Sequence, residues 1–296
     1  MQIKLVASDL DGTIIDKNNK ISPKNFTAIK KLHDKNVKFV ICTGKSYSIS
    51  KKICDKFEAQ YGIFGNGNQI VDLKNGKEIW SKQISNDDLK FIITFAKSYN
   101  FHTHIYLSSE VVSEKLSYLD LINYRLKNLN SSDEIRYRLV PNILKYVESK
   151  KTTAFSVVVS SSKNNLKEFE KVLELNKNIS YTYIRKRGMY RDEIIGKDYE
   201  YLNITAEGVN KDVALSQLEQ ILGISKNSTL AIGDNINDIE MVKNSGIGVA
   251  VFDSYNDLKE VATYTTKSST SDGAFSEAIE KFVRWLLIFS CFYFFV

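Results

Sequence analysis

Short apolar runs alternate with amphipathic stretches at the start of the chain. Three apolar runs have the length of buried strands: 3–8, 37–44 and 61–67. The stretches 22–36 and 46–57 between them predict helices, and the first opens with Ser22 and Pro23, which are typical of an N-cap and a first helical position. Because strands separated by helices favour crossover connections, this pattern predicts a parallel sheet.

The pattern changes near residue 68. Residues 68–84 predict a hairpin that turns at Asn75-Gly76. From about residue 83 to about 205 the strands alternate more between apolar and polar positions, and the helices carry more charge. Strands are expected at 101–107, 152–160 and 179–185, and helices at 87–99, 113–130 and 164–175.

The first pattern returns after residue 207. The expected elements are a helix over 210–223 that Gly223 ends, a strand over 228–234, a helix over 236–246 and a strand over 247–252. We therefore predict an α/β protein. Its Rossmann-like parallel-sheet core comprises residues 1–82 and 207–296, and a second α/β domain, 83–206, is inserted into that core.

Composition narrows the class of protein. The 296 residues are 43% hydrophobic and 26% charged, as in a globular chain. The net charge of +6 is mild for this length and the densest basic segment, 185–191, belongs to no recognisable nucleic-acid module, so no nucleic-acid partner is expected. Cys42, Cys54 and Cys291 have no disulfide-like spacing and no signal peptide precedes the first strand, which predicts a reducing cytoplasm.

Polar side chains follow the predicted buried strands. In chain order they are Asp9 and Asp11, then Thr43 with Gly44, then Asp234 with Asn237 and Asp238 close behind. Lys211 opens the helix that follows the inserted domain. Because ligands bind at the carboxyl ends of the strands in a parallel sheet, these groups are expected to gather in one crevice.

Carboxylates gathered in this way repel one another and need a counter-charge. Mg²⁺ is the natural one, because it prefers carboxylate oxygens and is usually completed by waters and a phosphate. One carboxylate could then attack phosphorus, and a second could protonate the leaving oxygen and later activate water. The residues therefore predict phosphoryl chemistry.

Four motifs in this order resemble the haloacid dehalogenase superfamily of phosphatases, specifically its Cof-like branch. They are "DLDGT" at 9–13, "TG" at 43–44, "GVNKDVAL" at 208–215 and "GDNINDIEM" at 233–241. With "FGNGNQIVD" and the late "SDGAFSEAIEKF", the resemblance covers nearly the whole chain. It implies that the inserted domain is an α/β cap, which closes over the site and selects the substrate.

The resemblance implies a role for each carboxylate. Asp9 is expected to be the nucleophile and a magnesium ligand. Asp11 is expected to be the general acid/base, with its backbone carbonyl also on the metal. Asp234 is the remaining protein ligand, and Asp238 lies near the metal, directly or through water.

The resemblance also implies phosphate contacts. Thr43, Lys211 and Asn237 are expected to supply them, together with the backbone around Leu10 and Gly44.

Two positions depart from the family pattern. Lys45 stands where arginine is common. Lysine keeps the positive charge but cannot donate two parallel hydrogen bonds to one anionic group as arginine does, so we expect an effect on substrate binding. Asp212 stands where glycine is common and adds a negative charge beside Lys211.

The expected activity is Mg²⁺-dependent hydrolysis of phosphate monoesters through an aspartyl phosphate. The substrate is expected to be a small metabolite: a sugar phosphate, a nucleotide or a phosphorylated cofactor. Two alternatives stay open. The same residues could serve a phosphotransferase or phosphomutase, or the protein could be a phosphate-ligand sensor or a membrane-associated interaction protein without turnover. The sequence does not specify the oligomeric state.

Two further features have no place in this chemistry. The apolar tail, 285–296, would span about 18 Å as a helix, against about 30 Å for a membrane core. It could dock on the protein, bind a partner or dip into a membrane surface, and membrane association is the less favoured interpretation. His102 and His104 share one strand face, where a structural or surface role is favoured over a metal site.

Overall fold

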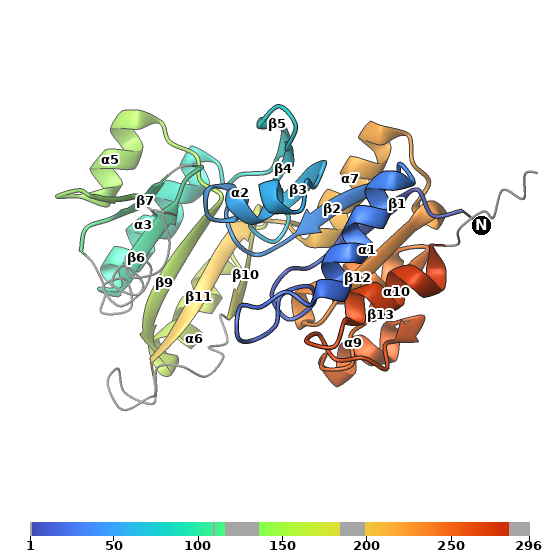
Figure 1. Cartoon of the computed structure of the whole chain (residues 1–296). Coiled ribbons are helices and arrows are strands. Elements are labelled where there is room, and N and C mark those ends of the chain that lie inside the picture. The colour runs from blue at the N-terminus through green and yellow to red at the C-terminus, as the bar shows by residue number, and fades with distance from the viewer. Residues whose placement is uncertain (1, 109, 116–135, 184–198, 284–296) are drawn as a thin grey trace, which may run out of the picture. The chain divides into compact units, whose positions relative to one another are not determined.

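The computed structural model describes residues 2–108, 110–115, 136–183 and 199–283 (Figure 1). The chain forms two compact units: Met1–Val40 with Glu219–Val296, and Ile41–Leu218. The first unit therefore joins the two ends of the chain, and the second is continuous in sequence. The domain limits expected from the sequence, 1–82 with 207–296 and 83–206, stay a prediction.

Parallel strands form the centre of the first unit. They are β1 (Leu5–Ser8), β12 (Thr229–Gly233), β13 (Ile247–Ala250) and β14 (Tyr264–Thr265). Their order is β14-β13-β12-β1, and each neighbouring pair is parallel. Every residue of β1 and β12 is buried, which explains why these strands are continuous apolar runs without alternation. The predicted parallel sheet is confirmed.

Four helices lie wholly within the described part of the first unit, and the sequence pattern predicted the first two of them. They are α1 (Pro23–Asp34), α8 (Ile239–Asn244), α9 (Asn256–Val261) and α10 (Ala274–Phe282), with 3₁₀ turns at Lys226–Ser228 and Ile236–Asp238. Buried Asn25 on α1 ties two segments together: its Nδ2 donates to the carbonyl of Ile14 at 3.2 Å, and its Oδ1 accepts from the N–H of Ser276 at 3.1 Å. Helices α1 and α10 thereby support the loop that follows β1.

The second unit begins within β2 (Lys38–Cys42), which crosses the division. Its first part contains α2 (Tyr47–Lys56), β3 (Tyr61–Phe64), β4 (Gln69–Asp72) and β5 (Lys77–Ser81). Strands β3, β4 and β5 are antiparallel neighbours, and Gly76 has a φ of +63° in the turn before β5. The predicted hairpin is confirmed. Helix α7 (Lys211–Leu222) ends the unit and crosses its boundary.

The rest of the second unit is a six-stranded sheet with helices. The strands are β6 (His102–Tyr106), β7 (Glu110–Ser113), β8 (Arg136–Leu139), β9 (Ser156–Ser162), β10 (Ile179–Tyr183) and β11 (Tyr199–Ala206). Their order is β10-β11-β9-β6-β7-β8, and only the pair β7–β8 is parallel. The described helices here are α3 (Asn86–Ser98), α5 (Ile143–Lys150) and α6 (Lys163–Leu173).

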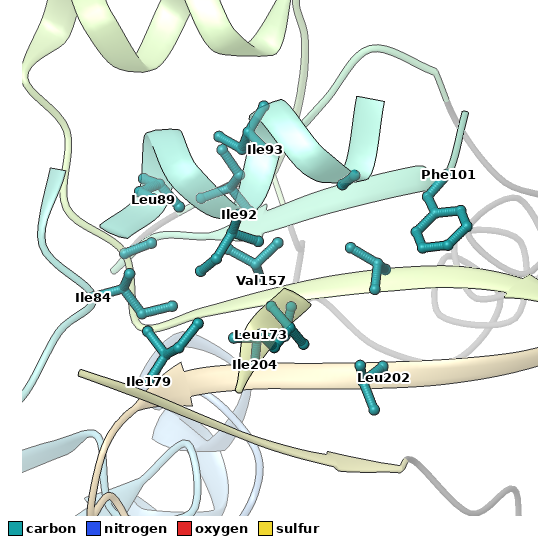
Figure 2. Close-up of a cluster of buried hydrophobic side chains, with 14 of the residues drawn as sticks. Ile84, Leu89, Ile92, Ile93, Phe101, Val157, Leu173, Ile179, Leu202 and Ile204 are labelled. Carbon is teal, nitrogen blue, oxygen red and sulfur yellow. The ribbon is translucent and has the colours of Figure 1, made fainter. Parts of the chain in front are cut away.

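These helices and one face of the six-stranded sheet enclose an apolar cluster (Figure 2). Ile105, Val157 and Ile204 form one row of it across β6, β9 and β11. Phe169 on α6 is fully buried, and its ring lies 5.2 Å from that of Phe101, edge to face. Every second residue of these three strands points into the cluster, because successive side chains of a strand lie on opposite faces of the sheet.

The sequence pattern did not predict β7, β8, β11, β14, α5, α9 or α10. The first two are four residues long, and β8 reads Arg-Tyr-Arg-Leu, so neither carries a readable period. Other predictions fall outside the described residues: the basic segment 185–191, the tail 285–296 and most of the helix expected over 113–130, whose first residue belongs to β7. Within the part of the chain that the structure describes, no helix is both long and apolar enough to cross a membrane.

Truncation of Phe169 tests whether this cluster stabilises the second unit. We expect Phe169→Ala to lower the free energy of unfolding by about 3–5 kcal/mol, because it leaves a cavity between α6 and the sheet. Leu175→Ala is the control: Leu175 is 76% exposed, and the cost should stay within about 0.5 kcal/mol. Urea unfolding followed by circular dichroism measures both. Equal costs for the two variants would contradict the packing described above.

Candidate active site

Two of the predicted aspartates meet because β1 and β12 are parallel neighbours. Ser8 pairs with Ile232, and the N–H of Asp9 donates to the carbonyl of Ile232 at 3.0 Å. Asp9 and Asp234 therefore leave the same edge of the sheet, at the carboxyl ends of their strands. Both are buried, with exposed fractions of 7% and 2%.

The third carboxylate is held by the loop after β12. Asp238 is fully buried, and its Oδ2 accepts from the N–H groups of Asp234 and Asn235 at 3.1 and 3.0 Å. Asn235 in turn caps the 3₁₀ turn that begins at Ile236. The segment 236–246, expected to be one helix, therefore begins with a 3₁₀ turn over Ile236–Asp238, and α8 starts only at Ile239. The side chain of Asp238 bonds back to the start of this loop.

Asp9, Asp234 and Asp238 form a compact set of oxygen ligands. Each offers one carboxylate oxygen, and these three atoms all lie within 4.8 Å of one another. Ionised carboxylates at this separation and away from water repel one another strongly. Oxygen-only donors at this spacing fit a hard divalent cation such as Mg²⁺, which prefers carboxylate oxygens. The donor set therefore matches the metal that the sequence predicts.

Gly12 allows the loop after β1 to approach these ligands. Its φ of +95° favours glycine, and a Cβ on it would lie 2.3 Å from Oδ2 of Asp234. The next residue, buried Thr13, donates from its hydroxyl to Oδ1 of Asp234 at 3.3 Å. The "DLDGT" motif thus orients Asp234 as well as supplying Asp9.

Sequence reasoning missed a second support of this loop. The hydroxyl of Thr270 donates to the carbonyl of Gly12. Nearby, Glu277 on α10 accepts from the N–H groups of Lys267 and Ser268, each at 2.8 Å. Burial raises the pKa of Glu277, but these hydrogen bonds outweigh it and lower the pKa to about 2. The motif "SDGAFSEAIEKF" was part of the family resemblance, but nothing in its spacing pointed to this contact.

Three other predicted residues lie nearby in the chain but have different surroundings. The side chain of Asp11 is exposed and is not one of the three clustered carboxylates. Leu10 is fully buried, and its carbonyl accepts from the N–H groups of Ile14 and Ile15. Asn237 is exposed within the 3₁₀ turn.

The predicted phosphate contacts Thr43 and Gly44 follow β2 in the second unit. Thr43 is 2% exposed, and its N–H donates to the carbonyl of Ile63 at 2.9 Å. Its hydroxyl accepts from the N–H of Lys45 at 3.2 Å, while Gly44 and Lys45 are themselves exposed. The preceding Cys42 is fully buried, which agrees with the packed thiol expected there.

A tight turn in the second unit contacts the backbone at Thr43 and at Asn210, the residue before Lys211. Gly65, Asn66 and Gly67 all have positive φ values, and the N–H of Asn66 donates to the carbonyl of Thr43 at 3.1 Å. A Cβ on Gly67 would lie 2.1 Å from the carbonyl oxygen of Asn210, so only glycine permits this approach.

Lys211 itself is almost completely buried, with 1% exposed. Asn210 before it accepts from the N–H of Val213 at 2.8 Å, which caps α7 and fixes Lys211 in the first helical position. A buried lysine is rare and marks a site where its charge is used or compensated.

These features define a class of protein: an α/β protein with a carboxylate-rich cation site at the carboxyl edge of a parallel sheet. Residues 6–279 match the family described as haloacid dehalogenase-like hydrolase, and the chain belongs to this family. The predicted family and fold class are confirmed. The protein is an enzyme of the haloacid dehalogenase type, a phosphoric monoester hydrolase.

Known relatives agree over nearly the whole chain. A Bacillus subtilis 5-amino-6-(5-phospho-D-ribitylamino)uracil phosphatase, YcsE, is 25% identical over 96% of this chain and 97% of its own. A phosphoglycolate phosphatase of Methanobrevibacter smithii is 27% identical over 96% of this chain and 100% of its own. The crystal structure of TM0651 from Thermotoga maritima shares the fold, with a TM-score of 0.77, 23% identity and coverage of 95% and 97%.

Substitution of Gly12 tests the close approach to Asp234. We expect Gly12→Ala to weaken Mg²⁺ binding at least about 10-fold in isothermal titration calorimetry, because the new methyl group displaces a ligand carboxylate.

Gly223→Ala is the matched control. Gly223 also has a positive φ, +64°, but no atom lies within 4 Å of a Cβ there. Its backbone strain should lower stability by about 1 kcal/mol and leave Mg²⁺ affinity unchanged. If both variants bind Mg²⁺ like the wild type, Gly12 has no role in the site.

Proposed function

We propose that this protein hydrolyses phosphate monoesters of small metabolites with Mg²⁺ bound by Asp9, Asp234 and Asp238. The observation that carries the proposal is the set of three buried carboxylate oxygens within 4.8 Å of one another at the carboxyl ends of β1 and β12. When bound, Mg²⁺ would offset negative charge on the carboxylates and on the phosphoryl group.

Asp9 is the nucleophile in this proposal. Its carboxylate attacks phosphorus, the bond to the leaving oxygen breaks, and an aspartyl phosphate forms on Asp9. Asp11 protonates the leaving oxygen and then takes a proton from the water that hydrolyses the intermediate. The exposed side chain of Asp11 is compatible with a role in which it must reach substrate and water.

Thr43 and Lys211 hold the phosphoryl oxygens in this proposal. The tight turn at residues 65–67 contacts the backbone beside both of them, so one rigid element positions a hydroxyl and an ammonium group. Backbone groups near Leu10 and Gly44, and the side chain of Asn237, complete the phosphate contacts. Lys45 lies next to Thr43 and is exposed, as a contact to the rest of the substrate requires.

The substrate class is drawn from the chemistry of the relatives. Two of them are named for a phosphorylated ribityl compound and for phosphoglycolate, both small phosphate esters. We propose a small phosphorylated metabolite for this chain also, and a cytoplasmic location. The cysteines have no disulfide-like spacing in the sequence, which supports a reducing compartment.

Release of inorganic phosphate from a panel of phosphate esters tests the proposal. We expect Asp9→Asn to reduce the rate by at least about 10³-fold, because the amide cannot form the intermediate. Asp257→Asn, an identical change on exposed α9, should keep the wild-type rate. Chelation of Mg²⁺ should abolish release in every active variant.

Two results would contradict the proposal. Asp9→Asn could release phosphate as fast as the wild type, or phosphate could move to an added alcohol instead of water. The second result would identify a phosphotransferase that uses the same residues.

A further inference from the structure

Asn68 follows the tight turn at residues 65–67 and is almost completely buried, with 3% exposed. Its Nδ2 lies 3.2 Å from the carbonyl oxygen of Lys82 and 2.8 Å from that of Phe155. Because both neighbours are acceptors, the amide nitrogen faces them and both of its hydrogens are used. The backbone carbonyl of Asn68 also accepts from the N–H of Lys82 at 2.8 Å. Asn68 therefore joins the turn to segments that lie 14 and 87 residues away in the sequence.

On one side, Asn68 packs against the turn itself. A Cβ on Gly65 would lie 3.0 Å from Oδ1 of Asn68. The N–H of Gly65 donates to the carbonyl of Lys45 at 3.0 Å, and the N–H of Asn66 donates to that of Thr43 at 3.1 Å. The turn that Asn68 supports is thus bonded to the segment that follows β2.

The same turn limits the position of Lys211. Gly67, next to Asn68, approaches the carbonyl oxygen of Asn210 so closely that a Cβ would lie 2.1 Å from it. Asn210 caps α7, and Lys211 is the first residue of that helix. A shift of the turn would therefore displace the backbone at both Thr43 and Lys211, because packed elements in direct contact move together.

On the other side, Asn68 is attached to the six-stranded sheet. Phe155 directly precedes β9, and its N–H donates to the carbonyl of Tyr106 on β6 at 3.0 Å. Both strands contribute residues to the apolar cluster. On β6 itself, the Nε2 atoms of His102 and His104 lie 2.8 Å apart, and both side chains are buried, which agrees with the structural role expected for them and excludes a surface role. The carbonyl of Phe155 is therefore a fixed point for the Asn68 amide.

The turn depends on such a support. Gly65, Asn66 and Gly67 have φ values of +60°, +57° and +109°. Backbone of this kind costs free energy and persists only where its surroundings hold it, and glycine has more conformations to lose than other residues. The Asn68 amide supplies two hydrogen bonds from a buried position, where a carbonyl that loses its donor is costly.

We propose that Asn68 is a positioning residue for the phosphoryl group: it anchors the turn at residues 65–67 to the six-stranded sheet and thereby fixes Thr43 and Lys211. The inference rests on the proposed function, in which these two residues hold the phosphoryl oxygens. A turn without this anchor would let the hydroxyl and the ammonium group drift from the geometry that a phosphate needs.

Inhibition by inorganic phosphate, the product, tests this role. We expect Asn68→Ala to raise the Ki of phosphate at least about 5-fold, because hydrogen bonds to charged oxygens depend on geometry. Its kcat/KM should fall by about 10–100-fold. Mg²⁺ affinity in isothermal titration calorimetry should not change, because Asp9, Asp234 and Asp238 belong to the first unit. Asn68→Ser, which keeps one donor, should give an intermediate Ki, and it decides the test if Asn68→Ala does not fold.

Asn86→Ala is the matched control. Asn86 begins α3, and its Nδ2 also donates to two main-chain carbonyls of the second unit, those of Val147 and Thr152, at 3.0 and 2.9 Å. These partners belong to α5 and the segment after it, away in sequence from the turn and from α7. Asn86→Ala should lower the midpoint of urea unfolding as the Asn68 variants do, and leave the Ki of phosphate at the wild-type value.

Two results would overturn the inference. The Asn68 variants could be less stable but keep the wild-type Ki, which would make Asn68 purely structural. Alternatively, Asn86→Ala could raise the Ki as much as Asn68→Ala, which would trace the effect to a general loss of stability.

Asp9→Asn separates this inference from the proposed function. If phosphate release depends on Asp9 but the Ki does not respond to the Asn68 variants, only the positioning role fails. If hydrolysis does not depend on Asp9, the proposed function fails, and the inference fails with it.

Discussion

Repulsion among three buried carboxylates is the constraint on which the rest of the site depends. Asp9, Asp234 and Asp238 are kept within 4.8 Å of one another and away from water, where like charges interact strongly. The parallel pairing of β1 and β12 brings two of them to one edge. Gly12 and Thr13 then fix Asp234 from the other loop. An arrangement that costs free energy without a cation is explained if a cation is bound in the working state.

The second unit supplies a different kind of rigidity. Its turn at Gly65, Asn66 and Gly67 has left-handed backbone at three successive residues and contacts the backbone at Thr43 and Asn210. A hydroxyl and a buried lysine are thereby held by main-chain geometry, so the phosphate contact that we propose for them would cost little entropy.

Much of the fold could be predicted because burial dictates its pattern. Strands β1, β2 and β12 are mostly apolar runs and almost every residue in them is buried, which is typical of strands covered on both faces. The short strands β7 and β8 could not be predicted, because four residues are too few to show a period. Their place depends on pairing with β6 and with each other, which is tertiary information.

The carboxylates of the site could be predicted because they belong to sequence motifs. Asp9 and Asp234 are found where the motifs and the strand ends suggested, and Asp238 completes the cluster. The contacts that hold them were not predictable, since Thr270 reaches Gly12 over 258 residues of sequence. The roles of Asp11, Asn237 and Lys45 stay predictions, because exposed side chains take their function from a substrate.

The stability of Asp234→Asn relative to the wild type, with and without Mg²⁺, tests the central claim most directly. If the carboxylates repel one another, the variant should unfold at higher temperature than the wild type in chelator, because it removes one of the three charges. Millimolar Mg²⁺ should stabilise the wild type and reverse the order. Two results together would contradict a cation site built from these three carboxylates. Mg²⁺ would fail to stabilise the wild type, and the wild type in chelator would be at least as stable as Asp234→Asn.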